Sequence, residues 1–369
     1  MPETPAAPAP PASPSRRTLL GAGIPAVAAL GVTAALGSPR PAVLGEPTGD
    51  ADLAAALSPQ LTSHRRVAVA LLGPGAEPRF AGFGADENRD FEIGSATKTF
   101  TGALLMAAVE AGEVELATTV AEVLPEAAGT AVADVTFAEL ASHTSGLPRL
   151  GSSLGLSSIW TTTLRKDPYA GQSPDDVIAD ALRSPLTGRG TVAYSNLGAA
   201  LEGQLLAKIG GDHWDTLLFE RILDPLGMTR TFAPITPNRL GDADPRGHSS
   251  TGHRAAAWTM NGYAPTGGIR STAADMARYL RAVIDGAAPV GSGLEPIARE
   301  NPAQQVAVHW FRTQLASGTE MIWHNGMTGG FASFIGFAPA SGRGVVLLTD
   351  TANTLDNLGV SILDGSLAA

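Results

Sequence analysis

Apolar residues along the chain follow two periods, one typical of strands and one typical of helices. Two short apolar runs near the start, residues 67–72 and 79–83, are separated by a Gly-Pro-Gly turn and predict two strands. Three runs near the end, residues 320–324, 330–338 and 344–350, are rich in β-formers and separated by glycine-containing turns. The pattern therefore predicts five strands, two from the start of the domain and three from its end.

Between these runs the apolar positions recur every three to four residues, which predicts helices. The clearest helix runs from residue 97 to residue 111 and stops at Gly112. Another begins at Ser173-Pro174, where serine can cap a helix and proline suits its first position. Further helices are predicted at residues 52–57, 272–285 and 354–367.

Strands and helices do not alternate regularly, which argues against a parallel sheet. We therefore predict an α+β fold, with an antiparallel five-stranded sheet flanked by helices. The sheet is expected from about residues 66–94 and 319–350, and an inserted all-helical region from about 113–300.

The first 37 residues have a different character from the rest. A Pro/Ala-rich start is followed by Arg16-Arg17 and then by a weakly hydrophobic, Gly- and Ala-rich run that ends at Gly37. This pattern is typical of a twin-arginine export signal, with residues 35–37 as a small-residue cleavage site. The alternative is an uncleaved membrane anchor, although Pro25 and the glycines make the run a poor span. We predict an export signal at 1–37, a linker at 38–51, one domain at 52–369 and a secreted protein.

Composition narrows the possible functions. The chain has 369 residues, 44% of them hydrophobic and 16% charged, which is typical of a globular protein. Its net charge of −10 offers no basic face for nucleic acid. It contains no cysteine, and its seven histidines show no metal-ligand spacing. We therefore predict no metal and no cofactor.

Lysine is rare in this chain, and one lysine has a suggestive neighbour. Of 25 Lys and Arg residues only Lys98, Lys166 and Lys208 are lysine. Lys98 follows Ser95 by one helical turn, so both would lie on one face at a helix N-terminus. There the Ser95 N–H is unpaired and the helix dipole favours an oxyanion. A buried lysine without a carboxylate partner can lose its proton and act as a base. An ordinary serine cap beside a solvated lysine is the alternative, but the flanking residues do not form a charged surface pattern.

Two later segments could complete such a site. Tyr194 could act as a base beside a buried lysine, and Asn196 could hold that lysine and bind a substrate carbonyl. Near the end, His324-Asn325-Gly326 lies on a predicted strand, where glycine allows close approach of a ligand. A backbone N–H of that strand could complete an oxyanion hole. Each segment is a weak signal alone.

Together, and in this order, the three segments resemble the motifs of the serine β-lactamase and D,D-peptidase superfamily. The similarity is to the branch of class C β-lactamases, D-alanyl-D-alanine carboxypeptidases and related esterases. Further segments fit that branch: residues 140–147, 265–272 and 329–331. The resemblance covers roughly residues 52–363 and implies an exported serine hydrolase that acts on a D-alanyl peptide, a β-lactam or an ester.

The resemblance also implies a role for each residue of the site. Ser95 would be the nucleophile that forms an acyl-enzyme, and Lys98 and Tyr194 would share the proton transfers. The sequence leaves open which of these two is the general base. Asn196, His324, Asn325 and Gly326 would bind substrate, and the backbone N–H groups of Ser95 and Met327 would form the oxyanion hole. His143 belongs to a segment interpreted as structural.

The third motif departs from the family pattern. His324 stands where lysine is common, and Asn325 stands where a hydroxyl residue is common. Both are weaker partners for a substrate carboxylate, so a carboxypeptidase or esterase role is favoured over efficient β-lactamase activity. A penicillin- or peptidoglycan-binding module without turnover is the rival hypothesis. A Gly-x-Ser-x-Gly sequence at residues 151–155 lacks the preceding strand that a nucleophile elbow needs.

Overall fold

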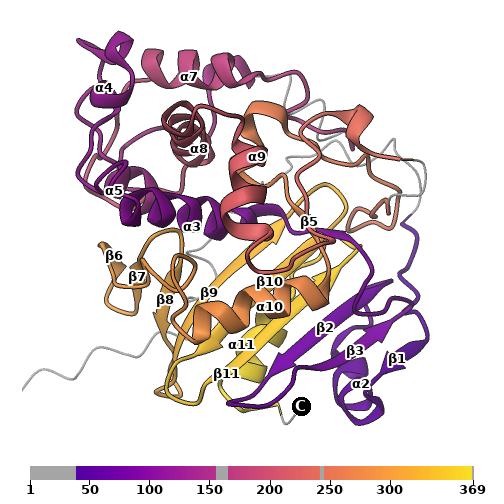
Figure 1. Ribbon diagram of the computed structural model, residues 1–369. Coiled ribbons are helices and arrows are strands. Elements are labelled where there is room, and N and C mark those ends of the chain that lie inside the picture. The colour runs from indigo at the N-terminus through magenta and orange to yellow at the C-terminus, as the bar shows by residue number, and fades with distance from the viewer. Residues whose placement is uncertain (1–38, 155–164, 242–244, 368–369) are drawn as a thin grey trace, which may run out of the picture.

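A nine-stranded antiparallel sheet forms the centre of the part that the computed structural model describes, residues 39–154, 165–241 and 245–367 (Figure 1). Its strand order is β1-β3-β2-β11-β10-β9-β8-β7-β6. The strands are β1 (Pro47–Gly49), β2 (Val67–Leu72), β3 (Arg79–Phe83), β6 (Ala298–Asn301), β7 (Gln304–Val306), β8 (Phe311–Gln314), β9 (Glu320–Met327), β10 (Ala332–Ala338) and β11 (Arg343–Thr349). The short strands β4 (Phe91–Glu92) and β5 (Arg270–Ser271) pair separately. The predicted α+β class is confirmed, and the export signal predicted for residues 1–37 lies outside the described residues.

The prediction of five strands was too low. Strands β3, β2, β11, β10 and β9 are the five predicted ones, and they form the middle of the sheet. β1 extends one edge, and β8, β7 and β6 extend the other. Each added strand spans only three or four residues, too short for an alternating pattern to stand out in the sequence. β1 lies in the segment predicted as a linker, and β6 lies in the region predicted as helical.

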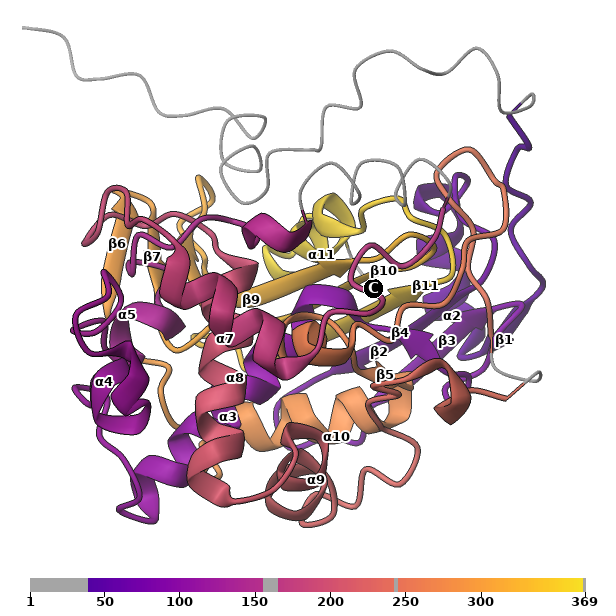
Figure 2. The same ribbon diagram turned by 90° about the horizontal axis from the view of Figure 1, so that it is seen from above.

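Helices cover both faces of the sheet (Figure 2). The helices are α2 (Ala51–Leu57), α3 (Thr97–Glu110), α4 (Val120–Val123), α5 (Phe137–Ala141), α7 (Pro174–Arg183), α8 (Asn196–Gly210), α9 (Trp214–Leu218), α10 (Ala273–Ile284) and α11 (Asp356–Leu363). The β2 side chains show why both faces are covered. Val67, Val69 and Leu71 share a core with α2 and α11, whereas the alternate residues of β2 share a core with α3 and α10.

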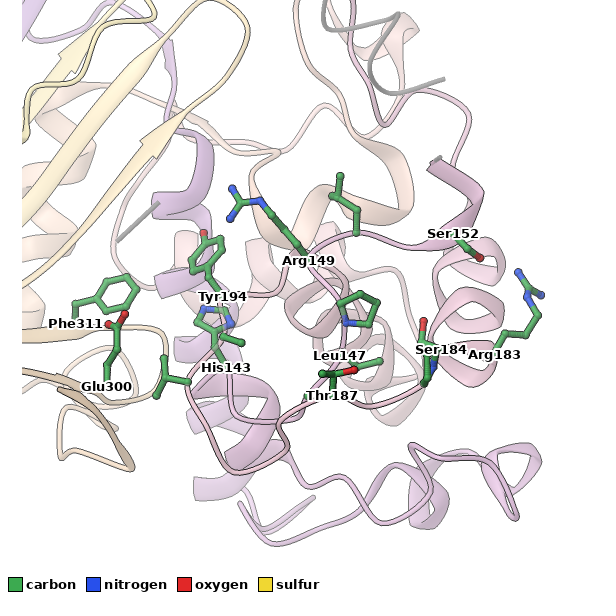
Figure 3. Close-up of a pocket in the computed structure, with 16 residues that line it drawn as sticks. His143, Leu147, Arg149, Ser152, Arg183, Ser184, Thr187, Tyr194, Glu300 and Phe311 are labelled. Carbon is green, nitrogen blue, oxygen red and sulfur yellow. The ribbon is translucent and has the colours of Figure 1, made fainter. Parts of the chain in front are cut away.

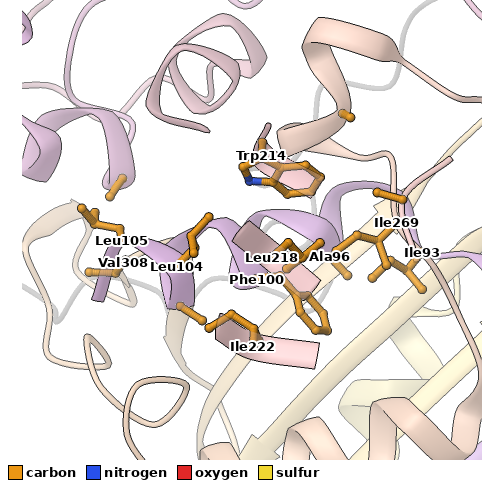
Figure 4. Close-up of a cluster of buried hydrophobic side chains, with 14 of the residues drawn as sticks. Ile93, Ala96, Phe100, Leu104, Leu105, Trp214, Leu218, Ile222, Ile269 and Val308 are labelled. Carbon is orange, nitrogen blue, oxygen red and sulfur yellow. The ribbon is translucent and has the colours of Figure 1, made fainter. Parts of the chain in front are cut away.

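Helix α3 is enclosed between the sheet and the helical region, and this position sets the environment of the site. Most of its residues are buried, including Lys98. Phe100 stacks on Tyr279 of α10 at 3.9 Å between ring centroids, and Figure 4 shows Leu218 and Ile222 beside it. The N-terminal turn of α3 is therefore held away from water by packing on several sides.

Where the sequence carries a strong capping signal, the helix ends agree with it. Helix α3 ends just before Gly112, which adopts a φ of +71°. Ser173 forms a capping box with Asp176 at the start of α7, and Thr272 caps α10. In the ranges given above, no helix is both long and apolar enough to cross a bilayer.

Candidate active site

Ser95 lies in the 3₁₀ turn η2 (Gly94–Ala96), which joins β4 to α3. Gly94 has a φ of +51°, and a Cβ built there would lie 2.6 Å from the backbone nitrogen of Met327. Glycine at this position therefore lets the turn approach the end of β9. The Ser333 hydroxyl donates to the Ile93 carbonyl at 2.6 Å and ties the same turn to β10. Ser95 itself remains partly accessible to solvent.

Lys98 lies directly behind Ser95. Its Nζ is 3.3 Å from Ser95 Oγ and 2.8 Å from the carbonyl oxygen of Thr266, and its side chain is fully buried. Burial lowers the pKa of Lys98 well below its usual value, and the positive charge of Arg149 lowers it further. No carboxylate in the described chain forms a salt bridge with Nζ. The geometry favours an unprotonated amine that can accept the Ser95 proton.

Tyr194 lies in the turn before α8, against Lys98. Lys98 Nζ is 4.8 Å from the centroid of the Tyr194 ring. The tyrosine hydroxyl is shielded from solvent and has no hydrogen-bond partner among the described residues. Burial raises the pKa of Tyr194, although the nearby Ser95 hydroxyl and the Arg149 charge act in the opposite direction. At rest Tyr194 is therefore a neutral phenol, which favours Lys98 as the base of the pair.

Asn196 is the first residue of α8, but in the described chain its side chain forms no hydrogen bond to Lys98. Its amide nitrogen donates to the hydroxyl of Tyr169 at 3.1 Å. Its Oδ1 atom is buried and has no partner within the part of the chain that is described. The contact to Lys98 comes instead from the Thr266 carbonyl, whose position depends on the fold and not on a side-chain motif.

The third motif lies on β9, where side chains point to alternate faces of the sheet. His324 is paired across the sheet with Ile335, which belongs to the core on the α3 side. Asn325 is paired with Phe334, which packs on the α11 side, and its amide donates to Asp356 at 2.8 Å. His324 thus lies near Lys98 and Tyr194, whereas the structure places Asn325 on the opposite face.

His324 is an uncharged acceptor in this site. Its Nδ1 lies 2.6 Å from the carbonyl oxygen of Asn325, so the proton belongs on that nitrogen. Burial lowers its pKa to about 3. Its Nε2 is buried without a partner among the residues described. His324 therefore cannot supply the positive charge that lysine supplies in the common form of this motif.

The end of β9 provides a backbone donor near Ser95. Thr328 N–H donates to the Phe331 carbonyl at 2.9 Å and closes the β9–β10 hairpin. Since hydrogen bonding alternates along an antiparallel pair, the Met327 N–H points away from β10. β8 pairs only with residues 320–323 of β9, so it does not cover Met327. The Met327 N–H thus pairs with neither β8 nor β10 and lies beside the Ser95 turn, which supports the predicted oxyanion hole of the Ser95 and Met327 N–H groups.

The proposed oxyanion hole depends on the absence of a side chain at Gly326, so a substitution there tests it. A Cβ at Gly326 would collide with the Ile93 carbonyl oxygen and lie 2.8 Å from the Ser95 nitrogen. We expect Gly326→Ala to lower kcat for ester hydrolysis by about 10²- to 10³-fold, because the two donors would be forced apart. Gly73→Ala is the control, since its Cβ would meet only Ala76 at 3.9 Å. An unchanged kcat in a folded Gly326→Ala protein would contradict this role.

Two residues near Tyr194 were not predicted as part of the site. The His143 ring packs on Tyr194 at 4.5 Å between centroids, and its Nδ1 accepts from the Ser195 N–H at 3.4 Å. This supporting position agrees with the structural interpretation of its segment. Arg149 lies over the same ring, with its guanidinium carbon 5.2 Å from the centroid. A single arginine in a loop carries no sequence signal of such a position.

A cavity of about 720 Å³ opens beside Tyr194 (Figure 3). Its walls include His143, Leu147, Arg149, Tyr194, Glu300 and Phe311. Ser95 and Lys98 are not among its lining residues, so the cavity adjoins the nucleophile and does not enclose it. Tyr194 belongs to both, since it lines the cavity and its ring lies 4.8 Å from Lys98 Nζ.

The fold and the Ser-Lys-Tyr arrangement define a serine hydrolase of the β-lactamase fold. The Beta-lactamase family matches this chain over residues 53–361, and the chain belongs to that family. Penicillin-binding protein 4 of Amycolatopsis lactamdurans is 30% identical over 315 residues, which cover 76% of this chain and 77% of that protein. A β-lactamase of Lysobacter lactamgenus is 24% identical over 385 residues, covering 90% and 95%.

Solved structures show the same fold at lower sequence identity. A class C β-lactamase from Rhodobacter sphaeroides superposes with a TM-score of 0.71 at 20% identity, covering 84% of this chain and 97% of the other. The D-alanine carboxypeptidase AmpC from Burkholderia cenocepacia gives a TM-score of 0.67 at 22% identity, covering 85% and 98%. The resemblance expected from the three motifs is therefore confirmed at the level of family and fold.

Proposed function

We propose that this chain is an exported serine hydrolase that cleaves an ester or a D-alanyl amide through an acyl-enzyme on Ser95. The observation that carries the proposal is the buried Lys98 amine, 3.3 Å from Ser95 Oγ and without a carboxylate partner in the described chain. A charged lysine would be solvated or paired, so this environment supports a base. Export rests on the twin-arginine pattern of residues 1–37.

In the proposed acylation, the Ser95 proton passes to Lys98 Nζ as Oγ forms a bond to the substrate carbonyl carbon. The carbonyl oxygen becomes an oxyanion between the N–H groups of Ser95 and Met327. The bond to the leaving group then breaks, and the leaving group takes up a proton from the Lys98–Tyr194 pair. In deacylation, water gives a proton to the same pair and attacks the acyl carbon, and Ser95 leaves as a hydroxyl.

The uncharged His324 supports an ester substrate over a substrate that presents a carboxylate to the third motif. A β-lactam and a D-alanyl-D-alanine peptide both present such a carboxylate, and the third motif of this chain offers it neither a cation nor a hydroxyl. A carboxylate at this end of the site would therefore meet no compensating charge.

A substrate panel on protein recovered from the culture medium of an export-competent host tests this proposal. We expect turnover of p-nitrophenyl esters or of a D-alanyl-D-alanine peptide, and slow turnover of nitrocefin. Rapid nitrocefin hydrolysis would contradict the preference. Labelling by a fluorescent penicillin without turnover of any substrate would favour a binding module, and recovery of the protein only from the cells would contradict export.

A further inference from the structure

Arg149 is a partly buried cation at the edge of the site, and the function given above does not use it. We propose that Arg149 binds a carboxylate of the substrate and so makes this hydrolase selective for acidic esters or amides. This inference rests on the proposed hydrolase function and names the substrate class of the same site. In this proposal Arg149, and not the third motif, supplies the positive charge that binds the substrate.

The backbone holds Arg149 in a defined position. Its carbonyl oxygen accepts hydrogen bonds from the N–H groups of Asn196 at 3.0 Å and Leu197 at 3.3 Å. The loop is therefore fixed to the start of α8, which also carries Asn196. Figure 3 shows the Arg149 side chain directed toward the hydroxyl end of Tyr194. Arg149 and Lys98 thus lie over one tyrosine ring, 5.2 Å and 4.8 Å from its centroid.

The guanidinium of Arg149 has no anionic partner in the ranges described. Other arginines of this chain pair with carboxylates, as Arg183 does with Asp180 and Arg189 with Glu139. Glu300, the acid on the cavity wall, instead accepts from Gln304 at 2.6 Å. Partial removal of a cation from water is unfavourable unless a counter-charge arrives, which a substrate carboxylate would supply.

The other unpartnered polar atoms of the site favour Arg149 as the anion-binding group. Asn196 Oδ1 and His324 Nε2 are acceptors, so they would repel a carboxylate. The Tyr194 hydroxyl can donate one hydrogen bond, and Arg149 can donate two from its planar fork. A carboxylate therefore finds complementary donors on the Tyr194 side of the site.

Matched esters test this selectivity. One pair places the charge on the acyl side, 4-nitrophenyl hemiglutarate against its neutral amide, 4-nitrophenyl 4-carbamoylbutyrate. The other places it on the leaving group, 3-carboxy-4-nitrophenyl acetate against 4-nitrophenyl acetate. We expect wild type to favour the acid of one pair in kcat/KM by about 10- to 100-fold, as for a hydrogen bond to a charged group. Arg149→Gln should remove that preference mainly through KM, and Arg149→Lys should restore part of it.

Arg183→Gln is the matched control, because Arg183 lines the same cavity but is already paired with Asp180. Its preference between acid and neutral ester should equal that of the wild type. If wild type hydrolyses the esters but prefers the acid in neither pair, the assignment of Arg149 is wrong. It is also wrong if Arg149→Gln lowers kcat/KM equally for the acidic and the neutral ester of a pair. Absence of hydrolysis of all four esters by wild type would instead overturn the proposed function, and this inference with it.

Discussion

Replacement of Ser95 by alanine is expected to lower kcat for ester hydrolysis by about 10⁴-fold or more. The substitution removes the nucleophilic oxygen, while the oxyanion donors and the pocket remain. Folding should persist, because in the described chain the Ser95 hydroxyl forms a single hydrogen bond, with Lys98 Nζ at 3.3 Å. Hydrolysis of 4-nitrophenyl acetate measures the rate, and intact-protein mass after reaction with penicillin measures the acyl-enzyme.

Ser153→Ala is the control for this experiment. Ser153 is the central serine of the Gly-x-Ser-x-Gly sequence, and its hydroxyl lies 2.5 Å from Asp180 Oδ2 and 2.6 Å from Gln172 Oε1, with no lysine among its hydrogen-bond partners in the described chain. This variant should keep the wild-type rate and the wild-type acyl adduct. Loss of activity in Ser153→Ala with retention in Ser95→Ala would assign the chemistry to a different serine.

Replacement of Lys98 by either methionine or arginine is expected to lower kcat by about 10²- to 10⁴-fold, the usual contribution of a general base. Methionine has no basic atom, and a guanidinium does not give up its proton. In wild type the rate should rise with pH through the lowered pKa of Lys98, because only the neutral amine accepts the Ser95 proton. Wild-type rates in either variant would remove Lys98 from the mechanism.

The same two variants should differ in stability. Because folding lowers the pKa of Lys98, the unfolded chain binds more protons between that lowered pKa and about 10.4. The free energy of unfolding of wild type should therefore rise with pH through this window, relative to Lys98→Met. Lys98→Arg should be less stable than Lys98→Met, since it buries a permanent charge. Urea unfolding from pH 6 to pH 10 measures both, and identical pH dependence in wild type and Lys98→Met would contradict a buried neutral lysine.

The part of the fold that could be predicted carries strong local signals. Strand β2 is apolar throughout, α3 is followed by Gly112 just after its C-cap, and α7 begins at a serine cap. The outer strands β1 and β6 could not be predicted, because their pairing depends on a neighbour in space and not on their own pattern.

The same division holds in the site. Ser95 and Lys98 are three residues apart in a helical segment, so the sequence predicts their contact directly. Asn325 adjoins His324 in the chain, yet the alternation of β9 sends the two side chains to opposite faces. Pairing with β10 settles which face each side chain takes, and a resemblance to a motif does not.

By itself the sequence determined the class of fold and the family, and it singled out Ser95, Lys98 and Tyr194 as the candidate site. Only the tertiary structure decided the state of these groups and their surroundings. It buried Lys98 beside the Thr266 carbonyl, set His324 as a neutral acceptor, and placed Arg149 over Tyr194. The physical reason is that a pKa, a missing counter-charge or a backbone donor depends on atoms from distant segments, and these segments meet only when the core packs.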